Sequence, residues 1–215
     1  MRIVIVGGHG KVAMHLHPLL SDRGHTVRGV IRDPDQADDL RDVGAEPVVC
    51  DIEAENDLSE AVGEADAVVF AAGAGPGSGA ARKWTVDRDG ALKLIEAART
   101  KGIDRYVMVS AMRVEEPRGD EVFRTYLKAK AEADRALRES GLAWTILRPG
   151  RLTNEPGRGR VALAPELPGG EVPRADVAAV LAEILETPGT AGLQLDLTSG
   201  DDPIPDAVAA VSARA

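Results

Sequence analysis

The sequence predicts an α/β fold in which one parallel sheet is covered by helices on both faces. Two observations carry this prediction: short apolar runs alternate with helical patterns along the chain, and several runs are continuously rich in Val and Ile. Continuous apolarity is typical of strands that are buried on both faces. The chain has 215 residues, enough for one large domain, and we expect a single domain over 1–215.

Seven apolar runs are the expected strands, and a helical pattern follows each of them. The strands are expected at 2–6, 26–31, 46–50, 66–70, 105–110, 143–147 and 193–197. The helices are expected at 11–23, 34–43, 56–63, about 80–100, 121–140, 174–186 and 203–213. The stretch at about 150–173 is rich in Gly and Pro, and we expect it to form a small C-terminal cap with a loop on the substrate side.

Composition narrows the classes of function. The formal net charge of −9 disfavours binding to nucleic acid and to anionic membrane surfaces. The apolar run Ile3–Val6 is too short for a signal peptide or a membrane span. Cys50 is the single cysteine, which fits a reducing, cytoplasmic setting, and without a Cys/His cluster we expect no metal site.

The first expected strand runs directly into the turn GGHGKVA, residues 7–13. The spacing Gly7-x-x-Gly10-x-x-Ala13 between a strand and a helix is that of a dinucleotide-binding fingerprint. Gly7 allows the sharp turn, and Gly10 lets backbone N–H groups approach a pyrophosphate at the helix N-terminus. Glycines also occur in tight corners without a ligand, but the strand–helix alternation favours the cofactor.

We therefore expect a doubly wound sheet of the Rossmann type, with about seven strands in the order 3-2-1-4-5-6-7. The pyrophosphate is expected along Gly7 to Val12, a segment that includes His9 and Lys11. His9 lies inside the glycine turn, and the sequence alone does not decide whether it contacts the phosphate.

Other strand ends should line the same crevice, because ligands of such sheets bind outside the carboxyl ends of the strands. Arg32 follows the second strand, where a guanidinium can bind the 2′-phosphate of NADP. Asp33 lies next to Arg32, close enough to the end of the second strand for an acid to bind the ribose hydroxyls of NAD. NAD therefore remains the less favoured alternative. Asp51 and Ile52 follow the third strand, and Asp51 either binds the adenine amino group or caps a helix. The fourth strand ends in small residues that let a cofactor lie close to the backbone: Ala71, Ala72 and Gly73.

Tyr126 and Lys130 lie four residues apart on one face of the same expected helix. An ammonium about 4 Å from a phenol contributes roughly 4 kcal/mol at an effective dielectric constant of 20, which would bring the pKa of Tyr126 near neutrality. Such a phenol can exchange a proton alongside hydride transfer. A surface tyrosine beside a solvated lysine gives the same spacing.

With these residues the chain resembles the short-chain dehydrogenase/reductase superfamily over nearly its whole length. The similarity is greatest to its small atypical members, which are related to NmrA-like proteins and to biliverdin-IXβ/flavin reductase. The glycine turn, the pair Tyr126-x-x-x-Lys130 and the segment Arg148-Pro149-Gly150 carry this resemblance. It implies that Pro149 lies beside the nicotinamide and that Lys130 binds the nicotinamide ribose.

The resemblance also implies two further catalytic positions. Asp87 takes the place of the family's active-site Asn, and Ser110 is the remaining serine in the run VSAMR. If Met112 stands at the serine position instead, the hydroxyl that polarises a carbonyl is missing.

The implied function is that of an NADP(H)-dependent reductase, or a related epimerase/dehydratase, acting on a small or flat substrate. The alternative is a non-catalytic, NADP-binding redox sensor like the NmrA-like proteins. We expect a monomer or homodimer whose partner is a small-molecule substrate.

Overall fold

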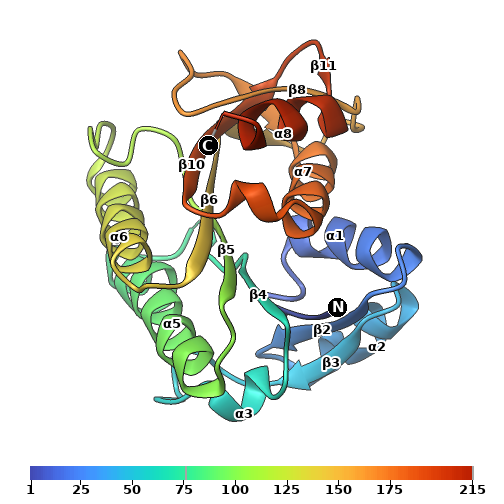
Figure 1. Cartoon of the computed structure of the whole chain (residues 1–215). Coiled ribbons are helices and arrows are strands. Elements are labelled where there is room, and N and C mark those ends of the chain that lie inside the picture. Colours follow the sequence, from blue (N-terminus) through green and yellow to red (C-terminus); the bar gives the residue numbers. More distant parts are fainter. Residues whose placement is uncertain (76, 215) are drawn as a thin grey trace.

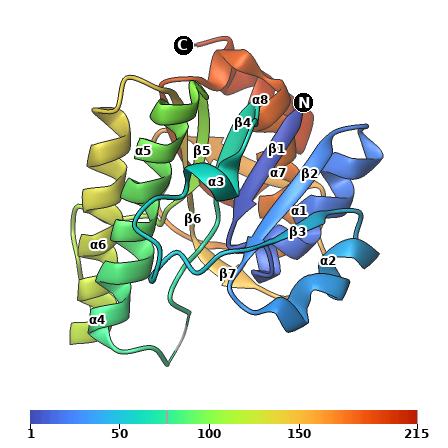
Figure 2. The ribbon, with the colours of Figure 1, turned by 90° about the horizontal axis from the view of Figure 1, so that it is seen from below.

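The computed structural model describes residues 1–75 and 77–214. A twisted central sheet is covered by helices on both faces (Figure 1). On one face lie α5 (Gly90–Lys101) and α6 (Glu121–Arg138), and on the other lie α1 (Lys11–Asp22) and α7 (Arg174–Glu186) (Figure 2). The predicted α/β architecture is confirmed.

Seven parallel strands form the body of the sheet in the order β3-β2-β1-β4-β5-β6-β10, which confirms the predicted order. Each is rich in β-branched or other apolar residues, which pack well in a sheet that is buried on both faces. Their bounds are β1 (Arg2–Val6), β2 (Thr26–Ile31), β3 (Glu46–Val49), β4 (Ala67–Phe70), β5 (Arg105–Val109), β6 (Ala143–Pro149) and β10 (Leu193–Ser199).

The strand count is larger than predicted. The stretch 150–173 contains three strands, β7 (Arg151–Thr153), β8 (Arg160–Ala164) and β9 (Glu171–Pro173). β8 pairs antiparallel with β10, and β11 (Asp202–Pro203) extends the sheet beyond β8 to nine strands. β7 and β9 form a separate parallel pair. The cap region thus continues the sheet, which ends at β3 on one edge and β11 on the other.

The predicted helices form with shifted bounds. The segment 34–43 divides into a 3₁₀ turn, η1 (Pro34–Gln36), and α2 (Ala37–Asp42). The helix expected at 56–63 shrinks to α3 (Ser59–Val62), because the Asp57 carboxylate accepts a hydrogen bond from the Ser59 N–H at 2.8 Å and ends the preceding loop there. The remaining helices are η3 (Pro188–Thr190) and α8 (Ile204–Ser212).

The segment predicted as one helix over about 80–100 changes its winding. It begins as α4 (Ala80–Arg82), continues as the π-helix η2 (Lys83–Asp89) and ends as α5. π-Helical turns are rare and occur frequently at functional sites. Two of the residues in η2, Lys83 and Asp87, are buried although they are charged.

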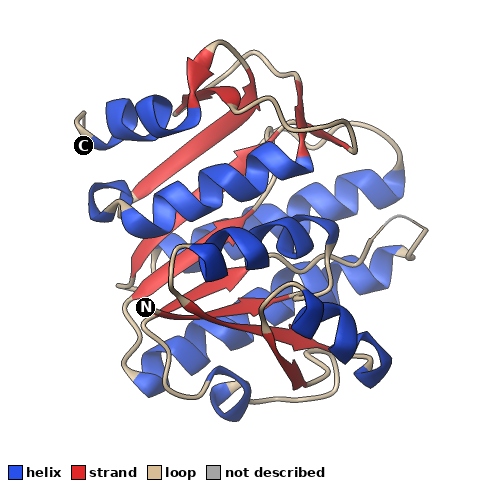
Figure 3. Cartoon of the chain, turned by 90° about the vertical axis from the view of Figure 1, so that its right-hand side faces the viewer, coloured by secondary structure: helices blue, strands red, loops and turns tan. Residues whose placement is uncertain are grey.

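Helices pack on both faces of the sheet (Figure 3), and a cluster of buried apolar side chains lies between each face and its helices. The first packs α1, α7 and α8 against one face, with Leu16, Leu181 and Val208 among its buried side chains. The second packs α3, α5 and α6 against the other face, with Phe70 and Leu94 in its interior. Within the described part of the chain, no helix combines the length and the apolarity that crossing a bilayer requires.

Candidate functional site

A cavity of about 800 Å³ lies at the carboxyl ends of the parallel strands. Its walls come from the turn after β1, the ends of β2, β4 and β5, the π-helix η2 and the first half of α6. This is where a doubly wound sheet binds its ligands. Most of the predicted cofactor-binding residues line it: Gly7, His9, Gly10, Lys11, Val12, Arg32, Asp51, Ile52, Ala71, Ala72 and Gly73.

The backbone of the glycine turn leaves no room for a side chain at Gly7. Its φ is +85°, and a Cβ would lie 2.6 Å from Cα of Ala72 at the end of β4. The Gly10 N–H donates to the carbonyl of Gly7 at 2.8 Å, which closes the turn. Gly10 precedes α1, and no side chain of the described residues caps this helix. The first N–H groups of α1 are therefore free to bind an anion in the cavity.

His9 lies in this turn beside the cavity but is held from another side. Its Nε2 is 2.7 Å from Oδ2 of Asp39 on α2, so the ring already has an anionic partner. The contact with Asp39 alone accounts for the position of His9, without a contact between His9 and phosphate.

At the far end of the cavity, arginines from two elements meet one carboxylate. Arg82 of α4 contacts Glu53 with Nη2 at 2.5 Å and Nε at 3.1 Å from Oε2, and Arg32 lies 3.6 Å from the same oxygen. The Arg82 guanidinium holds the pKa of Glu53 below its ordinary value. Asp51 lines the cavity, and its carboxylate accepts the Glu53 N–H at 2.9 Å within a turn and not at the start of a helix.

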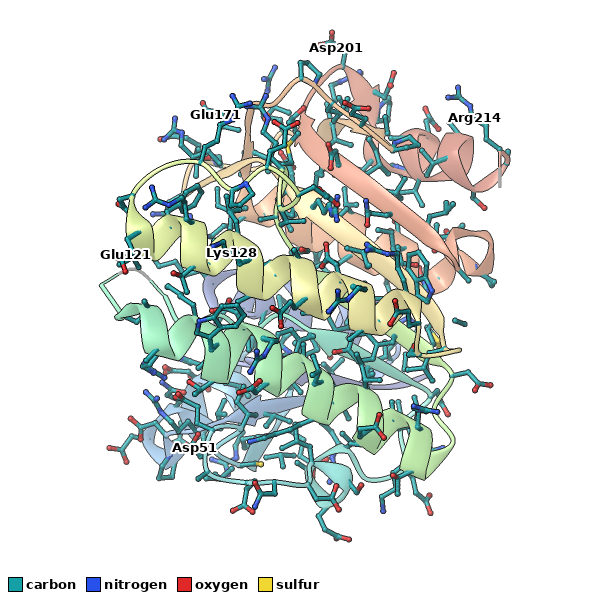
Figure 4. All side chains as sticks on the ribbon, turned by 90° about the vertical axis from the view of Figure 1, so that its left-hand side faces the viewer. Asp51, Glu121, Lys128, Glu171, Asp201 and Arg214 are labelled. Atoms are coloured by element: carbon teal, nitrogen blue, oxygen red, sulfur yellow. The ribbon has the colours of Figure 1, made fainter. Side chains whose placement is uncertain are left out.

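The predicted catalytic residues share one wall of the same cavity: Asp87, Ser110, Tyr126 and Lys130. Asp87 is fully buried, and Lys130 is only 3% exposed. Nζ of Lys130 donates to the Val109 carbonyl at 3.0 Å and lies 3.5 Å from Oδ1 of Asp87. Lys128, two residues away, lies on the outer face of α6 instead (Figure 4).

Ser110 follows β5 and lines the cavity, whereas Met112 is buried away from it. The Ser110 hydroxyl makes no well-formed hydrogen bond to a described residue, and the carboxylate toward which it can donate is that of Asp134. Buried hydroxyl groups are normally paired, so a ligand in the cavity can compete with Asp134 for this hydroxyl. The structure thus places Ser110, and not Met112, where a substrate carbonyl could be polarised.

The electrostatics of Tyr126 differ from the prediction. Burial, together with the carboxylates of Asp87 and Asp134, raises the pKa of Tyr126 well above its ordinary value. Lys130 does not offset this, because its ammonium lies beside Asp87 and 6.0 Å from the centre of the phenol ring. The expectation of a Tyr126 pKa near neutrality is wrong for this state of the protein, in which the phenol stays protonated.

Lys83 is a site residue that sequence reasoning missed. It is 7% exposed, lines the cavity and lies 5.7 Å from the centre of the Tyr126 ring, on η2. Its ammonium donates to the Gly75 carbonyl at 2.7 Å and to Ser78 Oγ at 2.9 Å. The spacing of four residues between Lys83 and Asp87 was the one available signal that both share a helix face.

Pro149 is the predicted cofactor-binding residue that does not line the cavity. It is buried at the end of β6, where it pairs with Leu197 of β10. Beside it, Arg148 is buried and contacts Oδ2 of Asp134 with Nε at 3.0 Å and Nη2 at 2.7 Å. Arg148 also reaches Oε1 of Glu115 at 2.6 Å. Arg148 and Pro149 therefore lie outside the cavity lining, and Arg148 is paired with Asp134, a carboxylate whose charge acts on Tyr126.

Replacing Asp87 by Asn should lower the pKa of Tyr126, because it removes a negative charge that disfavours the phenolate. The measurement is an alkaline titration that follows phenolate absorbance. Only two tyrosines are present, and the second, Tyr106, is fully buried, with its own pKa raised by burial.

The control is Asp89→Asn, which removes a half-buried carboxylate of the same π-helix that is paired with Arg88. It should leave the titration of Tyr126 in place. An equal shift in both variants would mean that Asp87 has no special effect on the phenol.

The family model for NAD(P)H-binding proteins matches residues 7–188. A curated relative, the uncharacterized sugar epimerase YhfK of Bacillus subtilis, is 38% identical over 97% of this chain and 99% of its own. The putative NAD-dependent epimerase/dehydratase from Bacillus halodurans superposes with a TM-score of 0.93 at 39% identity, covering 98% and 99% of the two chains. The oxidoreductase ylbE from Lactococcus lactis gives 0.86 at 26% identity, covering 98% and 96%.

Proposed function

The chain belongs to the NAD(P)H-binding family, and from this premise we propose that it is an NADP(H)-dependent oxidoreductase acting on a carbonyl group of a small or flat substrate. One observation carries the proposal. The cavity that the glycine turn lines is also lined by the side chains of Tyr126, Lys130, Ser110 and Asp87. A proton donor and a nucleotide-binding turn in one cavity are what hydride-transfer chemistry requires.

The residues of the turn fit a dinucleotide. The free N–H groups of α1 would bind the pyrophosphate, and the tight approach of Gly7 to Ala72 keeps that space clear of side chains. Arg32 favours a 2′-phosphate and hence NADP over NAD. When bound, the nicotinamide supplies or accepts the hydride.

The chain's own residues handle the proton. Tyr126 is protonated, so its phenol can donate a proton to the oxygen of a substrate carbonyl. Ser110 can give the same oxygen a hydrogen bond, because its hydroxyl lines the cavity and is not held by a well-formed hydrogen bond. Lys130 supplies a positive charge next to Asp87, where it can bind the nicotinamide ribose. A protonated phenol favours the direction of reduction.

Related chemistry fits the same residues. The relatives described as epimerases favour an alternative reaction, in which a substrate alcohol is oxidised and then reduced again in one site. Oxidation followed by reduction needs Tyr126 to accept a proton as well as donate one. Asp87 opposes proton acceptance, because it raises the pKa of the phenol. We therefore favour reductase over epimerase or dehydratase.

The second candidate is a non-catalytic NADP-binding sensor. The observation in its favour is the buried Lys130–Asp87 pair, which engages the ammonium that would otherwise assist Tyr126. For either function we propose a cytoplasmic setting with a small-molecule ligand, and a monomer or homodimer that binds no nucleic acid.

The first experiment is thermal unfolding with NADPH, NADH and their oxidised forms. A ligand at 100 times its Kd adds about 2.7 kcal/mol, roughly 5–11 °C in Tm for a domain of this size. We expect such a shift with NADPH and a smaller one with NADH. Inorganic phosphate at equal concentration is the control for binding of any anion.

NADPH oxidation is then followed with a set of carbonyl compounds. Turnover supports the oxidoreductase, and nucleotide binding without turnover of any compound favours the sensor. No shift with any nicotinamide nucleotide would contradict both candidates.

A further inference from the structure

The Arg32 guanidinium already has an anionic partner, because the Glu53 carboxylate lies beside it. Glu53 follows β3, and its side chain lies between Arg32 at the end of β2 and Arg82 on α4. All three side chains line the cavity. Since the residue after β2 in such folds meets the ribose 2′ position, Glu53 lies where the 2′-phosphate of NADP would arrive.

The contacts of Glu53 are those that a phosphate makes with arginine. Arg82 binds it in a fork, with Nη2 at 2.5 Å and Nε at 3.1 Å from Oε2, and Thr85 donates to Oε1 at 2.6 Å. Arg32 Nη1 is 3.6 Å from Oε2. Guanidinium groups recognise carboxylate and phosphate with the same planar geometry.

We propose that the 2′-phosphate of NADP(H) takes the place of the Glu53 carboxylate between Arg32 and Arg82. This rests on the proposed function and names its specificity-determining residues. Arg82 becomes a second ligand of the phosphate, and Glu53 becomes the group that competes with it. An NAD ribose has only a hydroxyl at this position, which leaves the carboxylate in place and can donate to it.

The charges favour this exchange. The Glu53 carboxylate lies between the two guanidinium groups, and the Asp51 carboxylate also acts on Arg82 from the same wall. A phosphate close to 2− that entered beside Glu53 would meet a like charge, whereas a phosphate that displaces it meets two cations.

The backbone on both sides of Glu53 is held by hydrogen bonds, so the exchange requires only the Glu53 side chain to move. The Glu53 N–H is held by Asp51 Oδ1 at 2.9 Å. Nζ of Lys93 donates to the carbonyls of Ile52 at 2.8 Å and Glu55 at 2.6 Å. With its backbone fixed on both sides, Glu53 can release the arginines by rotating its side chain, which is 24% exposed.

The test compares two small ligands that differ only in the 2′-phosphate: 2′,5′-ADP and 5′-AMP. Their Kd values are measured by calorimetry for the whole protein. For the natural chain we expect tighter binding of 2′,5′-ADP. In Arg82→Met and in Arg32→Met this preference should fall about tenfold or more with 5′-AMP unchanged, as for loss of a charged hydrogen bond. In Glu53→Gln the preference should rise several-fold.

The control is Arg41→Met, which removes an exposed arginine of α2 that is paired with Asp38 and should leave both Kd values unchanged. Unchanged preference in Arg82→Met, or a lower preference in Glu53→Gln, would overturn the exchange. Equal Kd values for the two ligands in the natural chain would overturn it while leaving nucleotide binding intact. Failure to bind either ligand, or NADPH itself, would count against the proposed function.

Discussion

Phenylalanine in place of Tyr126 is expected to lower kcat for NADPH oxidation by a factor of about 10² to 10⁴. The substitution removes only the phenolic hydroxyl, the group that donates the proton in the proposed reduction. The ring remains to stack on Phe123, whose ring centre is 5.8 Å away. The Kd for NADPH should therefore hardly change, and the loss should fall on kcat.

Tyr106→Phe is the matched control for this experiment. Tyr106 is the second tyrosine of the chain, fully buried in β5, and its hydroxyl donates to the Ala91 carbonyl at 3.2 Å. Losing that hydrogen bond should cost about 1 kcal/mol in the free energy of unfolding and leave kcat unchanged. If Tyr126→Phe turns over at the natural rate, the phenol has no part in the reaction.

Replacing Arg148 by Met is expected to lower the free energy of unfolding by about 3–5 kcal/mol, because it leaves the fully buried Asp134 without its cation. For a domain of this size the corresponding fall in Tm is roughly 6–20 °C. Chemical or thermal unfolding measures it directly. Arg88→Met is the control, because Arg88 forms more exposed ion pairs with Asp89 and Glu132 that should be worth about 1 kcal/mol or less.

The loss in Arg148→Met should depend on pH. Burial already raises the pKa of Asp134 in the folded protein, and Arg148 is the first of the groups that oppose this. Without Arg148 the folded pKa rises further above the unfolded value, so the folded state binds more protons as the pH falls. The destabilisation should therefore be smaller at mildly acidic pH than at neutral pH. A second substitution, Asp134→Leu, should restore much of the stability.

The parallel body of the fold could be predicted because burial on both faces leaves a direct mark in the sequence. Strands such as Arg2–Val6 and Ala67–Phe70 are short, apolar and followed by helical patterns. β8 and β11 could not be predicted in this way. They lie among Gly and Pro, and β11 has two residues, so their formation depends on the edge that β10 offers and not on local preference.

The site residues likewise differ in whether the sequence near them carries a signal. The glycine turn and the Tyr126–Lys130 pair depend on local spacing, and the structure brings both into one cavity. Lys83, Glu53 and Arg82 come from segments that meet only after folding. The pKa of Tyr126 was predicted in the wrong direction because spacing shows which charges are near along the helix. It does not show that Asp87, from another helix, lies beside Lys130.

The edges of the nine-stranded sheet have a consequence for association during folding. An exposed strand edge is a template on which another chain can add, and proteins blunt such edges with proline, charge and short strands. β3 carries Glu46 and Pro47, and β11 consists of Asp202 and Pro203. Proline cannot donate to a ladder, so each edge lacks a full row of donors. Nascent chains that have formed this sheet should thus resist edge-to-edge aggregation and polymerisation into longer sheets.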